Sequence, residues 1–491
     1  MRLLKKIARR LPEPLILFAL LALITIVLSA IAAALNLSAI NPGDRSQIEA
    51  VSLLSGDGIR RIVSEAVTNF AEFPPLGVVL VAMLGVGVAE SSGLLAAAIQ
   101  QVVAVTSAWL VSPVIVLMGI MSSIATDVGY VVLIPLGAIV FLGFKRHPLA
   151  GIAAAFAGVS GGFSANLLIT PLDPFFSGFS QSAAQLIEPN YTVDATANYY
   201  FMAVSTLMLT LVGWYVTDKI IEPRLPVIER DNDIASEQTT AIERRGLNWA
   251  GYSLLIFIAC ILGMLLPPEG VLREPTQLTI VPSPFLDGIV FFVALGFFIP
   301  GVVYGKVTGT MSTGKEIAEG MTNAMRSMAY FIALAFVAAQ FTAYLSWSNL
   351  GTILAINGAN LLENLGIGGF FLLLLFILLT IALNLIVSSA AKWAILAPVF
   401  VPMLMLSGFS PATAQVAFRI GDSATNIITP TMSYLPIILG FARKYDKQID
   451  IGKLIMLMLP YAIAFLLGWL VLLVVWYVFD LPLGVGAGMF I

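Results

Sequence analysis

The chain has 491 residues, of which 59% are hydrophobic and 11% charged, and its mean hydropathy is +0.96. Soluble proteins carry about a quarter charged residues, so the composition excludes a soluble multidomain protein and predicts a polytopic membrane protein built as one all-α bundle. A net charge of −3 argues against a nucleic-acid-binding protein. One cysteine and one histidine leave no internal disulfide, Cys/His metal site or hydrolase of the Cys–His or Ser–His type.

Seven continuous apolar stretches are long enough for helices that cross about 30 Å of hydrocarbon. They lie at 14–36, 75–95, 197–218, 249–267, 284–304, 328–346 and 454–479. Two longer stretches, 149–187 and 411–442, are interrupted by Gly, Pro and polar residues, which predicts broken spans. Between the first two spans, residues 58–73 have the amphipathic spacing typical of an interfacial helix or a dimer contact.

The basic residues indicate the orientation in the membrane. Five of them precede the first span, whose apolar part is too long for a cleaved signal peptide, so we expect a retained helix that leaves the cytoplasm. With the N-terminus inside, most of the 25 Lys and Arg residues lie on the cytoplasmic side, as the positive-inside rule requires. The polar segment 222–247 is then a cytoplasmic linker, and the C-terminus lies outside.

Two apolar segments, 110–144 and 369–407, have both ends on one side in this topology and are predicted to be re-entrant hairpins. Their polar tips are SSIATD (122–127) and SSAAKW (388–393). Each hairpin follows a full span and a short arm, near 97–109 and 351–366, and precedes a broken span. The breaks contain SGGFSANLLITP (160–171) and GDSATNIITP (421–430), with Gly161, Gly162 and Pro171 breaking one helix and Gly421 and Pro430 the other.

This order predicts two repeats of opposite orientation, 75–187 and 328–442, and nine transmembrane helices in total. Inverted repeats with broken helices are typical of secondary transporters. Broken backbone inside a membrane must be buried in protein or line a wet cavity. Helix N-termini at such points favour anions, and unwound carbonyl groups can hold a cation. We therefore expect a site near the midplane for a small organic anion and a coupling cation.

Ionisable residues in these interruptions cost about 2.5–3.5 kcal/mol each at a helix centre, which indicates a function. The candidates are Asp127, Asp173, Lys392, Arg419 and Asp422. Structural roles stay open for four of them: Arg419 and Asp422 are three residues apart and could neutralise each other, Lys392 could cap helix carbonyls, and Asp127 could be an N-cap. Asp173 lies between two prolines and is expected to line a cavity.

Uncharged polar residues complete the predicted site. Hydroxyl groups at the tips suit either a substrate carboxylate or helix capping, and amide and hydroxyl groups at the breaks suit either the substrate or the broken backbone. These residues are Ser122, Ser123, Ser388 and Ser389 at the tips and Asn166, Thr170, Asn426 and Thr429 at the breaks. A sodium ion is considered near Asn166 and Asn426. Trp393 offers an aromatic face for a planar ring, or it fills the core.

The tips SSIATDVGY and SSAAKWAILAPVFVPML and the breaks SGGFSANLLITPLDP and AFRIGDSATNIITPTMSYLP resemble the AbgT family of p-aminobenzoyl-glutamate transporters. The resemblance runs over nearly the whole chain. It implies nine transmembrane helices, two re-entrant hairpins and a homodimer in the bacterial inner membrane. It also implies import of p-aminobenzoyl-glutamate, or efflux of sulfonamide and p-aminobenzoate-like compounds, by exchange with a proton or sodium gradient and without a further cofactor.

The resemblance assigns functional positions to Asp173, Trp393, Arg419 and Asp422, and a helix-shaping role to Pro411. The alternative is a sodium-coupled symporter for dicarboxylates or related organic anions with a similar architecture. An intramembrane enzyme is not expected, because no nucleophile–base pair or metal set is present. An ion channel fits poorly, because hairpins entering from two sides imply gates that alternate.

Overall fold

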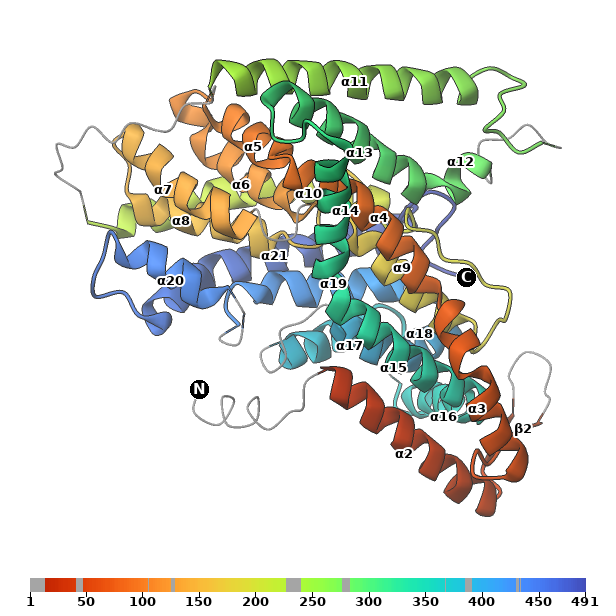
Figure 1. Cartoon of the computed structure of the whole chain (residues 1–491). Helices are drawn as coiled ribbons and strands as arrows, with labels where there is room; N and C mark the ends of the chain where they lie inside the picture. The colour runs from red at the N-terminus through yellow and green to blue at the C-terminus, as the bar shows by residue number, and fades with distance from the viewer. Residues whose placement is uncertain are drawn as a thin grey trace.

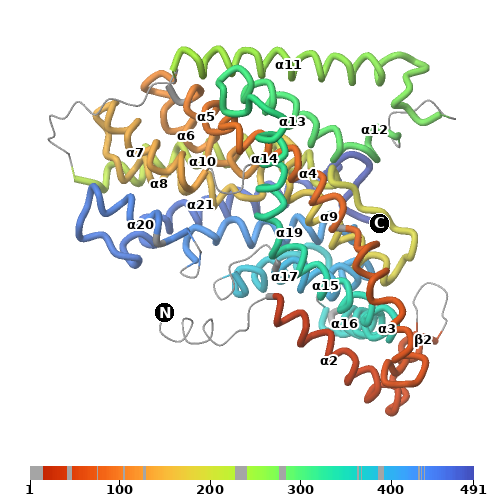
Figure 2. The backbone as a smooth tube through the Cα atoms, in the orientation of Figure 1, coloured from red at the N-terminus to blue at the C-terminus, as the bar shows by residue number. Residues whose placement is uncertain are grey.

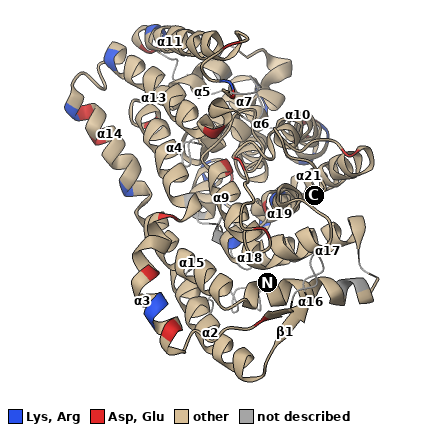
Figure 3. Ribbon diagram, turned by 90° about the vertical axis from the view of Figure 1, so that its right-hand side faces the viewer, with Lys and Arg blue, Asp and Glu red and all other residues tan. Residues whose placement is uncertain are grey.

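The computed structural model describes residues 14–40, 47–104, 106–124, 129–226, 240–275, 283–366, 368–384, 391–429, 432 and 434–491. These residues are mainly helical (Figure 1). One small antiparallel sheet pairs β1 (Ser38–Ile40) with β2 (Gln47–Glu49). Charged side chains are sparse on the helices and gather on α3 (Gly56–Ala71) and α14 (Gly314–Ser327), as Figure 3 shows.

Within the described residues, seven helical segments are long and apolar enough to cross a membrane. They confirm the seven continuous stretches expected from the sequence. The segments are Leu15–Ala34, Gly56–Ser91, Tyr199–Arg224, Ala241–Leu265, Ile289–Thr308, Ala329–Trp347 and Ile451–Phe479. The second segment joins the amphipathic α3 to α4 (Pro74–Ser91), so the amphipathic stretch predicted at 58–73 is helical as expected.

One of these helices, near the middle of the chain, is surrounded by much less protein than the others. α2 (Pro14–Ala34) packs on α15 (Ala329–Trp347), and α13 (Ile289–Thr308) packs on α4. Only 6% of the apolar window of α11 (Ala241–Leu265) is buried, and this helix lies along one edge of the molecule, beside α13 (Figure 1). An apolar helix with so little protein contact needs lipid or another chain around it.

Both predicted breaks exist. The first span runs as α8 (Pro148–Phe156) and a π-helical turn (Ala157–Gly161), is irregular over 162–171, and resumes as α9 (Leu172–Ala184). The second consists of α19 (Pro411–Asn426) and α20 (Leu435–Arg443). The prediction that Gly421 breaks its helix is wrong, because it lies inside α19. A Cβ there would lie 2.9 Å from the Ile377 carbonyl oxygen, so this glycine allows α19 to approach α17 (Gly369–Asn384) closely.

The first predicted hairpin returns to the place where it starts. It consists of α6 (Val111–Met121), a 3₁₀ turn (Ser122–Ile124), a π-helical turn (Gly129–Leu133) and α7 (Ile134–Gly143). Ser112 Oγ, at its beginning, donates a hydrogen bond to Asp218 Oδ1 over 2.5 Å. Arg146, just after its end, contacts the same oxygen at 2.5 Å. The two ends of this segment therefore meet beside the end of α10 (Tyr199–Tyr215).

The second predicted hairpin consists of α17 and α18 (Ala391–Leu406). Its two ends also meet, at the ring of Tyr477 near the end of α21 (Ile451–Phe479). The rings of Phe370 and Phe409 lie 5.1 Å and 6.4 Å from that of Tyr477. This contact is aromatic, whereas the corresponding contact of the first hairpin is ionic.

The two hairpins begin at opposite ends of the bundle. α10 and α21 run antiparallel, because Thr217 bonds to Tyr461 over 2.7 Å while Phe201 packs against Trp476 at 5.2 Å. Asp218 therefore lies near Tyr461, in the first half of α21, and Tyr461 and Tyr477 are about 24 Å apart along a helix that rises 1.5 Å per residue. In Figure 2 the turn between α7 and α8 is at the left and the C-terminus at the right.

The short arms before the hairpins are α5 (Leu94–Ala104) and α16 (Leu350–Asn364). The first ends five residues earlier than the predicted boundary at 109, and residues 108–110 form a separate 3₁₀ turn. The exposed ring of Trp109 lies on this turn. The remaining elements are the short α12 (Pro284–Asp287) and the amphipathic α14, which connects α13 to α15.

Arg146 holds the ends of the first hairpin to α10. Its Nε lies 3.0 Å from each carboxylate oxygen of Glu222, and Asp218 Oδ2 accepts a hydrogen bond from Trp214 Nε1 at 2.7 Å. Burial alone lowers the pKa of Arg146, but its hydrogen bonds to the two carboxylates outweigh burial and the pKa is raised. The neighbouring His147 has a pKa lowered by burial, which suits its neutral Nδ1 as the acceptor of the Leu149 N–H at the start of α8.

Replacing Arg146 by Gln should destabilise the protein by about 3 kcal/mol, because two mostly buried carboxylates would lose their counter-charge. Thermal unfolding of the purified protein in detergent measures the loss. The matched control is Arg224→Gln at an exposed position, for which we expect no measurable change. Equal unfolding temperatures for the two variants would show that Arg146 does not hold the hairpin.

Candidate transport site

The two broken segments meet at their related motifs. Ser164 and Ser423 occupy the same place in SANLLITP (164–171) and SATNIITP (423–430), and Ser164 N donates a hydrogen bond to Ser423 Oγ over 3.1 Å. Residues 259 positions apart in the sequence are thus in direct contact. The predicted site lies around this contact, between the irregular segment 162–171 and α19.

Arg419 of α19 is paired with Asp173 at the start of α9. Its Nη2 lies 2.8 Å from Asp173 Oδ1, and the arginine side chain is 1% exposed. Nη1 donates to the Ser164 carbonyl oxygen at 3.2 Å, and Nη2 also donates to Gln415 Oε1 at 3.1 Å. The guanidinium carbon lies 4.6 Å from the centre of the Phe176 ring. Arg419 therefore joins α19, α9 and the first break.

Asp173 is held by the break itself. Its Oδ2 accepts hydrogen bonds from the backbone N of Thr170 at 2.7 Å and from Thr170 Oγ1 at 2.9 Å. With 13% of its side chain exposed, it lines a small cavity together with Ser164, Asn166 and Tyr199. The sequence prediction that Asp173 faces a cavity agrees with this position.

The ion pair has an uncharged counterpart. When each member of the Arg419–Asp173 pair is shifted by 259 positions, the spacing of the two Thr-Pro motifs, the resulting residues are Ser160 and Met432. Ser160 Oγ lies 3.6 Å from Met432 Sδ. The contact that joins α19 to α9 is therefore mirrored by a contact between the π-helical turn and the residues just before α20.

A second buried ion pair joins α18 to α19. Lys392 Nζ lies 2.5 Å from Asp422 Oδ1, and the two side chains are 4% and 3% exposed. Lys392 also contacts Asn384 Oδ1, at the end of α17. The possibility that Arg419 and Asp422 neutralise each other is thus not realised, because each has its own partner on another element. Residues three apart on α19 lie on one face, and both α9 and α18 contact α19, so each helix supplies a partner for one of the two charges.

Asn384, which the sequence analysis did not select, is at the centre of this polar cluster. Its Nδ2 donates to the Asp422 carbonyl oxygen at 2.7 Å, to Thr425 Oγ1 at 2.8 Å and to Asn426 Oδ1 at 3.0 Å. Gln415, beside Arg419, was missed for the same reason. A single amide outside the two related motifs was the only signal for either residue, and nothing in the sequence indicates which partners such an amide has.

Asn166, in the first broken span, makes contacts similar to those of Asn426 in the second. Its Nδ2 donates to Ser123 Oγ at 3.0 Å and to the Ile120 carbonyl oxygen at 3.4 Å, and its Oδ1 accepts from Leu168 N at 2.9 Å. Asn166 and Asn426 thus each contact the end of the first helix of the hairpin that precedes them. Ser122 and Ser123 bond back to the carbonyl oxygens of Gly119 and Ile120, at 2.7 Å and 2.9 Å, as expected for helix capping.

Trp393 is fully enclosed. Its Nε1 donates to the Phe176 carbonyl oxygen at 3.1 Å and to Ser180 Oγ at 3.2 Å, and its ring packs 4.8 Å from that of Phe418. At 0% exposure it has no free face in this structure, which matches the core-filling alternative. A role in binding a planar ring stays a prediction.

Two of the predicted helix-shaping prolines lie at helix starts. Pro411 is the first residue of α19, where the Ser410 side chain caps the helix by accepting from Thr413 N at 3.2 Å. Pro171 is the N-cap residue of α9, at the end of the break. Asp127, Ser388, Ser389 and Pro430 lie outside the described residues.

Breaking the Arg419–Asp173 pair should cost about 3–5 kcal/mol of stability, because the remaining charge would be buried without a partner. Arg419→Gln and Asp173→Asn are therefore expected to lower the unfolding temperature strongly, and the double variant by less than the sum of both. A double-mutant cycle on thermal unfolding measures this coupling. Arg326→Gln, at an exposed position of α14, is the control. Strictly additive losses would contradict a direct pair.

Comparison with known proteins places the chain in one family. Over residues 1–491 it matches the family described as "AbgT putative transporter family". It is 40% identical over 483 residues to the p-aminobenzoyl-glutamate transport protein of Escherichia coli, covering 98% of this chain and 95% of that protein.

Two solved structures are also similar to it. One is the YdaH transporter of Alcanivorax borkumensis, described as having an unusual topology, with a TM-score of 0.94, 46% identity and coverage of 96% of this chain and all of that one. The other is MtrF of Neisseria gonorrhoeae, described among a class of antimetabolite efflux pumps, with a TM-score of 0.94, 42% identity and coverage of 99% of both chains. The full-length match, the shared fold and the buried ion pairs at two helix breaks lead to one conclusion: the chain is a multi-pass membrane transporter, not an enzyme, and belongs to the AbgT family.

Proposed function

We propose that the protein is an ion-gradient-driven secondary transporter of p-aminobenzoyl-glutamate and related p-aminobenzoate and sulfonamide compounds, and that it acts as an antimetabolite efflux pump in the bacterial inner membrane. The observation that carries the proposal is the buried Arg419–Asp173 pair at the first helix break. A substrate carboxylate and the Asp173 carboxylate compete for the same guanidinium. Binding of an anionic substrate to Arg419 therefore requires that the Arg419–Asp173 pair opens.

The proposal includes two inverted repeats, 75–187 and 328–442, joined by the linker 222–247. Two contacts between the halves support it: the hydrogen bond between the equivalent Ser164 and Ser423, and the Ser160–Met432 contact that mirrors the Arg419–Asp173 pair. The position of the two hairpins also supports it, because they start at opposite ends of the α10–α21 pair. In such an arrangement the site is reached in turn from each side of the membrane.

We further propose nine transmembrane helices and two re-entrant hairpins, 110–144 and 369–407, with the N-terminus in the cytoplasm and the C-terminus outside. The distribution of basic residues supports this orientation. A homodimer is part of the proposal, and the sparsely buried α11 offers apolar surface for a second chain or for lipid.

A sodium-coupled symporter for dicarboxylates or other organic anions is the second candidate. The oxygen-rich cluster of Asp422, Asn384 and Asn426 favours it, because hard cations prefer carboxylate and amide oxygens. In this structure the Lys392 ammonium group contacts Asp422 Oδ1 and Asn384 Oδ1, so a sodium ion would have to take its place. The other asparagine considered for sodium, Asn166, is surrounded by Ser123 and helix carbonyls. The two candidates differ in the driving ion, and only the first requires that the substrate contain an aromatic ring.

Arg419→Ala and Asp422→Ala should abolish transport, because each removes one member of a buried pair at the site. Flux of radiolabelled p-aminobenzoyl-glutamate and of a sulfonamide into proteoliposomes, with proton and sodium gradients imposed separately, measures it. We expect saturable, counterflow-competent flux driven by the proton gradient. Arg326→Ala serves as the control. Normal flux in both site variants would overturn the assignment, and flux driven only by sodium would favour the second candidate.

The hairpin tips should be accessible to water from opposite faces. In a Cys260→Ser background, cysteines at Thr126 and Ala391 are expected to react with a membrane-impermeant maleimide added to the cytoplasmic and outer face, respectively, and substrate should slow both reactions. A cysteine at the exposed apolar Leu211 on α10 is expected to stay unreactive. Labelling of either tip only from the opposite face would rule out the hairpin that contains it.

A further inference from the structure

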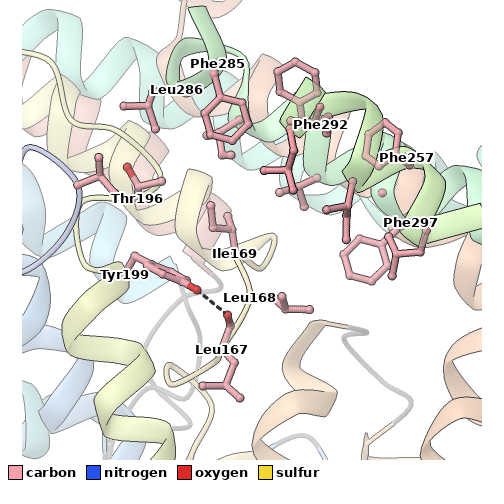
Figure 4. A pocket seen from close by; sticks show the side chains of 18 residues that line it. Leu167, Leu168, Ile169, Thr196, Tyr199, Phe257, Phe285, Leu286, Phe292 and Phe297 are labelled. Carbon is pink, nitrogen blue, oxygen red and sulfur yellow. Dashed lines mark hydrogen bonds between the residues drawn. The ribbon is translucent and has the colours of Figure 1, made fainter. Parts of the chain in front are cut away.

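A large apolar cavity lies between the first break and two helices outside the repeats. Its volume is about 500 Å³, and Figure 4 shows its wall. Phenylalanines Phe257 of α11 and Phe292 and Phe297 of α13 form one side. The other side is formed by the break, through Leu168 and its neighbours, and by Tyr199 at the start of α10. A cavity of about 150 Å³ with such a lining already admits benzene, so this one has room for a substituted ring.

The cavity adjoins the charged site. Leu168 and Tyr199 line both this cavity and the small cavity that contains Asp173, Asn166 and Ser164. The Tyr199 hydroxyl donates to the Leu167 carbonyl oxygen at 3.0 Å, which fixes the ring between the two spaces (Figure 4). A molecule with an apolar end and an anionic end could therefore place one end among the phenylalanines and direct the other toward Asp173, whose partner Arg419 lies directly behind the small cavity.

One polar group of the wall has unused hydrogen-bonding capacity. The Thr196 hydroxyl is buried and has no hydrogen-bond partner within the described residues. An unsatisfied buried hydroxyl is unfavourable, and a rotation about its χ1 toward a polar substituent on a bound ring would recover part of the lost hydrogen bonding. The cavity wall thus suits an aromatic ring with a small polar substituent better than a plain hydrocarbon chain.

We propose that this cavity is the subsite for the aryl ring of the transported anion, with Phe257, Phe292 and Leu168 as residues that determine specificity. The inference rests on the proposed function and adds the place and the selectivity of ring binding. It assigns the ring to the boundary between the break and α11 and α13, whereas the enclosed Trp393 packs inside the repeats. Helices outside the repeats would then select the substrate, and the charged residues would hold its anionic end.

The test compares two substrates that differ only in the acyl group, p-aminobenzoyl-glutamate and hexanoyl-glutamate. Their binding to the purified full-length protein is measured by calorimetry, and their flux in proteoliposomes. Phe257→Ala and Phe292→Ala should each weaken binding of the aryl compound about tenfold and binding of the hexanoyl compound clearly less, because only the aryl compound loses a ring–ring contact in addition to buried apolar area. Phe291→Ala, one residue earlier on α13 and 55% exposed, should change neither.

A second set of variants guards against misfolding. A Cβ on Gly296 would meet only Phe257 Cε1, at 3.6 Å, so Gly296→Ala should fold and bind the aryl compound normally. Gly296→Leu projects a larger side chain into the cavity and should weaken aryl binding at least tenfold while the protein stays monodisperse. Normal aryl binding in Phe257→Ala and Gly296→Leu would overturn the inference.

Two further outcomes separate the inference from its premise and from a rival. If the parental protein does not transport p-aminobenzoyl-glutamate at all, both the proposed function and the inference are wrong. If the parental protein transports it and the variants bind and transport it equally well, only the proposed aryl subsite is wrong. A lipid chain as the occupant predicts that the variants lose co-purified phospholipid and weaken both compounds equally, and this result would also overturn the inference.

Discussion

Charge inside a membrane protein has to be matched by opposite charge, and α19 is the element on which this matching depends. Arg419 reaches Asp173 on α9, and Asp422 reaches Lys392 on α18. One helix therefore fastens the break of the first half to the second hairpin. Each buried pair adds little net stability, because desolvation of the two charges offsets much of their Coulomb attraction. Removing one partner, however, destabilises the protein strongly, because the other charge is then buried alone. Such a balance suits a site in which partners are exchanged.

The network of amides around the pairs explains why irregular backbone is tolerated here. Asn166 and Asn426 each contact the end of a hairpin's first helix. Asn384 donates to the Asp422 carbonyl oxygen, and Asp173 accepts from the backbone N of Thr170, so side chains pair with backbone groups near the breaks. Unsatisfied backbone groups in hydrocarbon cost several kcal/mol each. The polar side chains at the breaks thus keep the backbone open at the point where the charged residues meet.

The periodic and compositional signals in the sequence predicted the seven continuous helices and both breaks, because length, apolarity, glycine and proline act locally. They also selected the four charged residues of the two pairs, since charge is rare in such a chain. Pairing could not be predicted, because it depends on the approach of α9 and α18 to α19. Gly421 was misread for the same reason: its small size serves the contact with α17, which no local pattern reveals. The enclosure of Trp393 likewise follows from the packing of Phe176 and Phe418 around it.

The neutral contact between Ser160 and Met432 has an electrical consequence. Arg419, Asp173, Lys392 and Asp422 sum to zero, and the matching positions of Arg419 and Asp173 in the opposite halves carry no charge. Displacing these four side chains together does no work against the membrane potential. Once a carboxylate takes up a proton or an anion enters, the same displacement carries a net charge, and about 2.3 kcal/mol per elementary charge and 100 mV then acts on it. The membrane potential would therefore act on this displacement only in states in which the site carries a net charge.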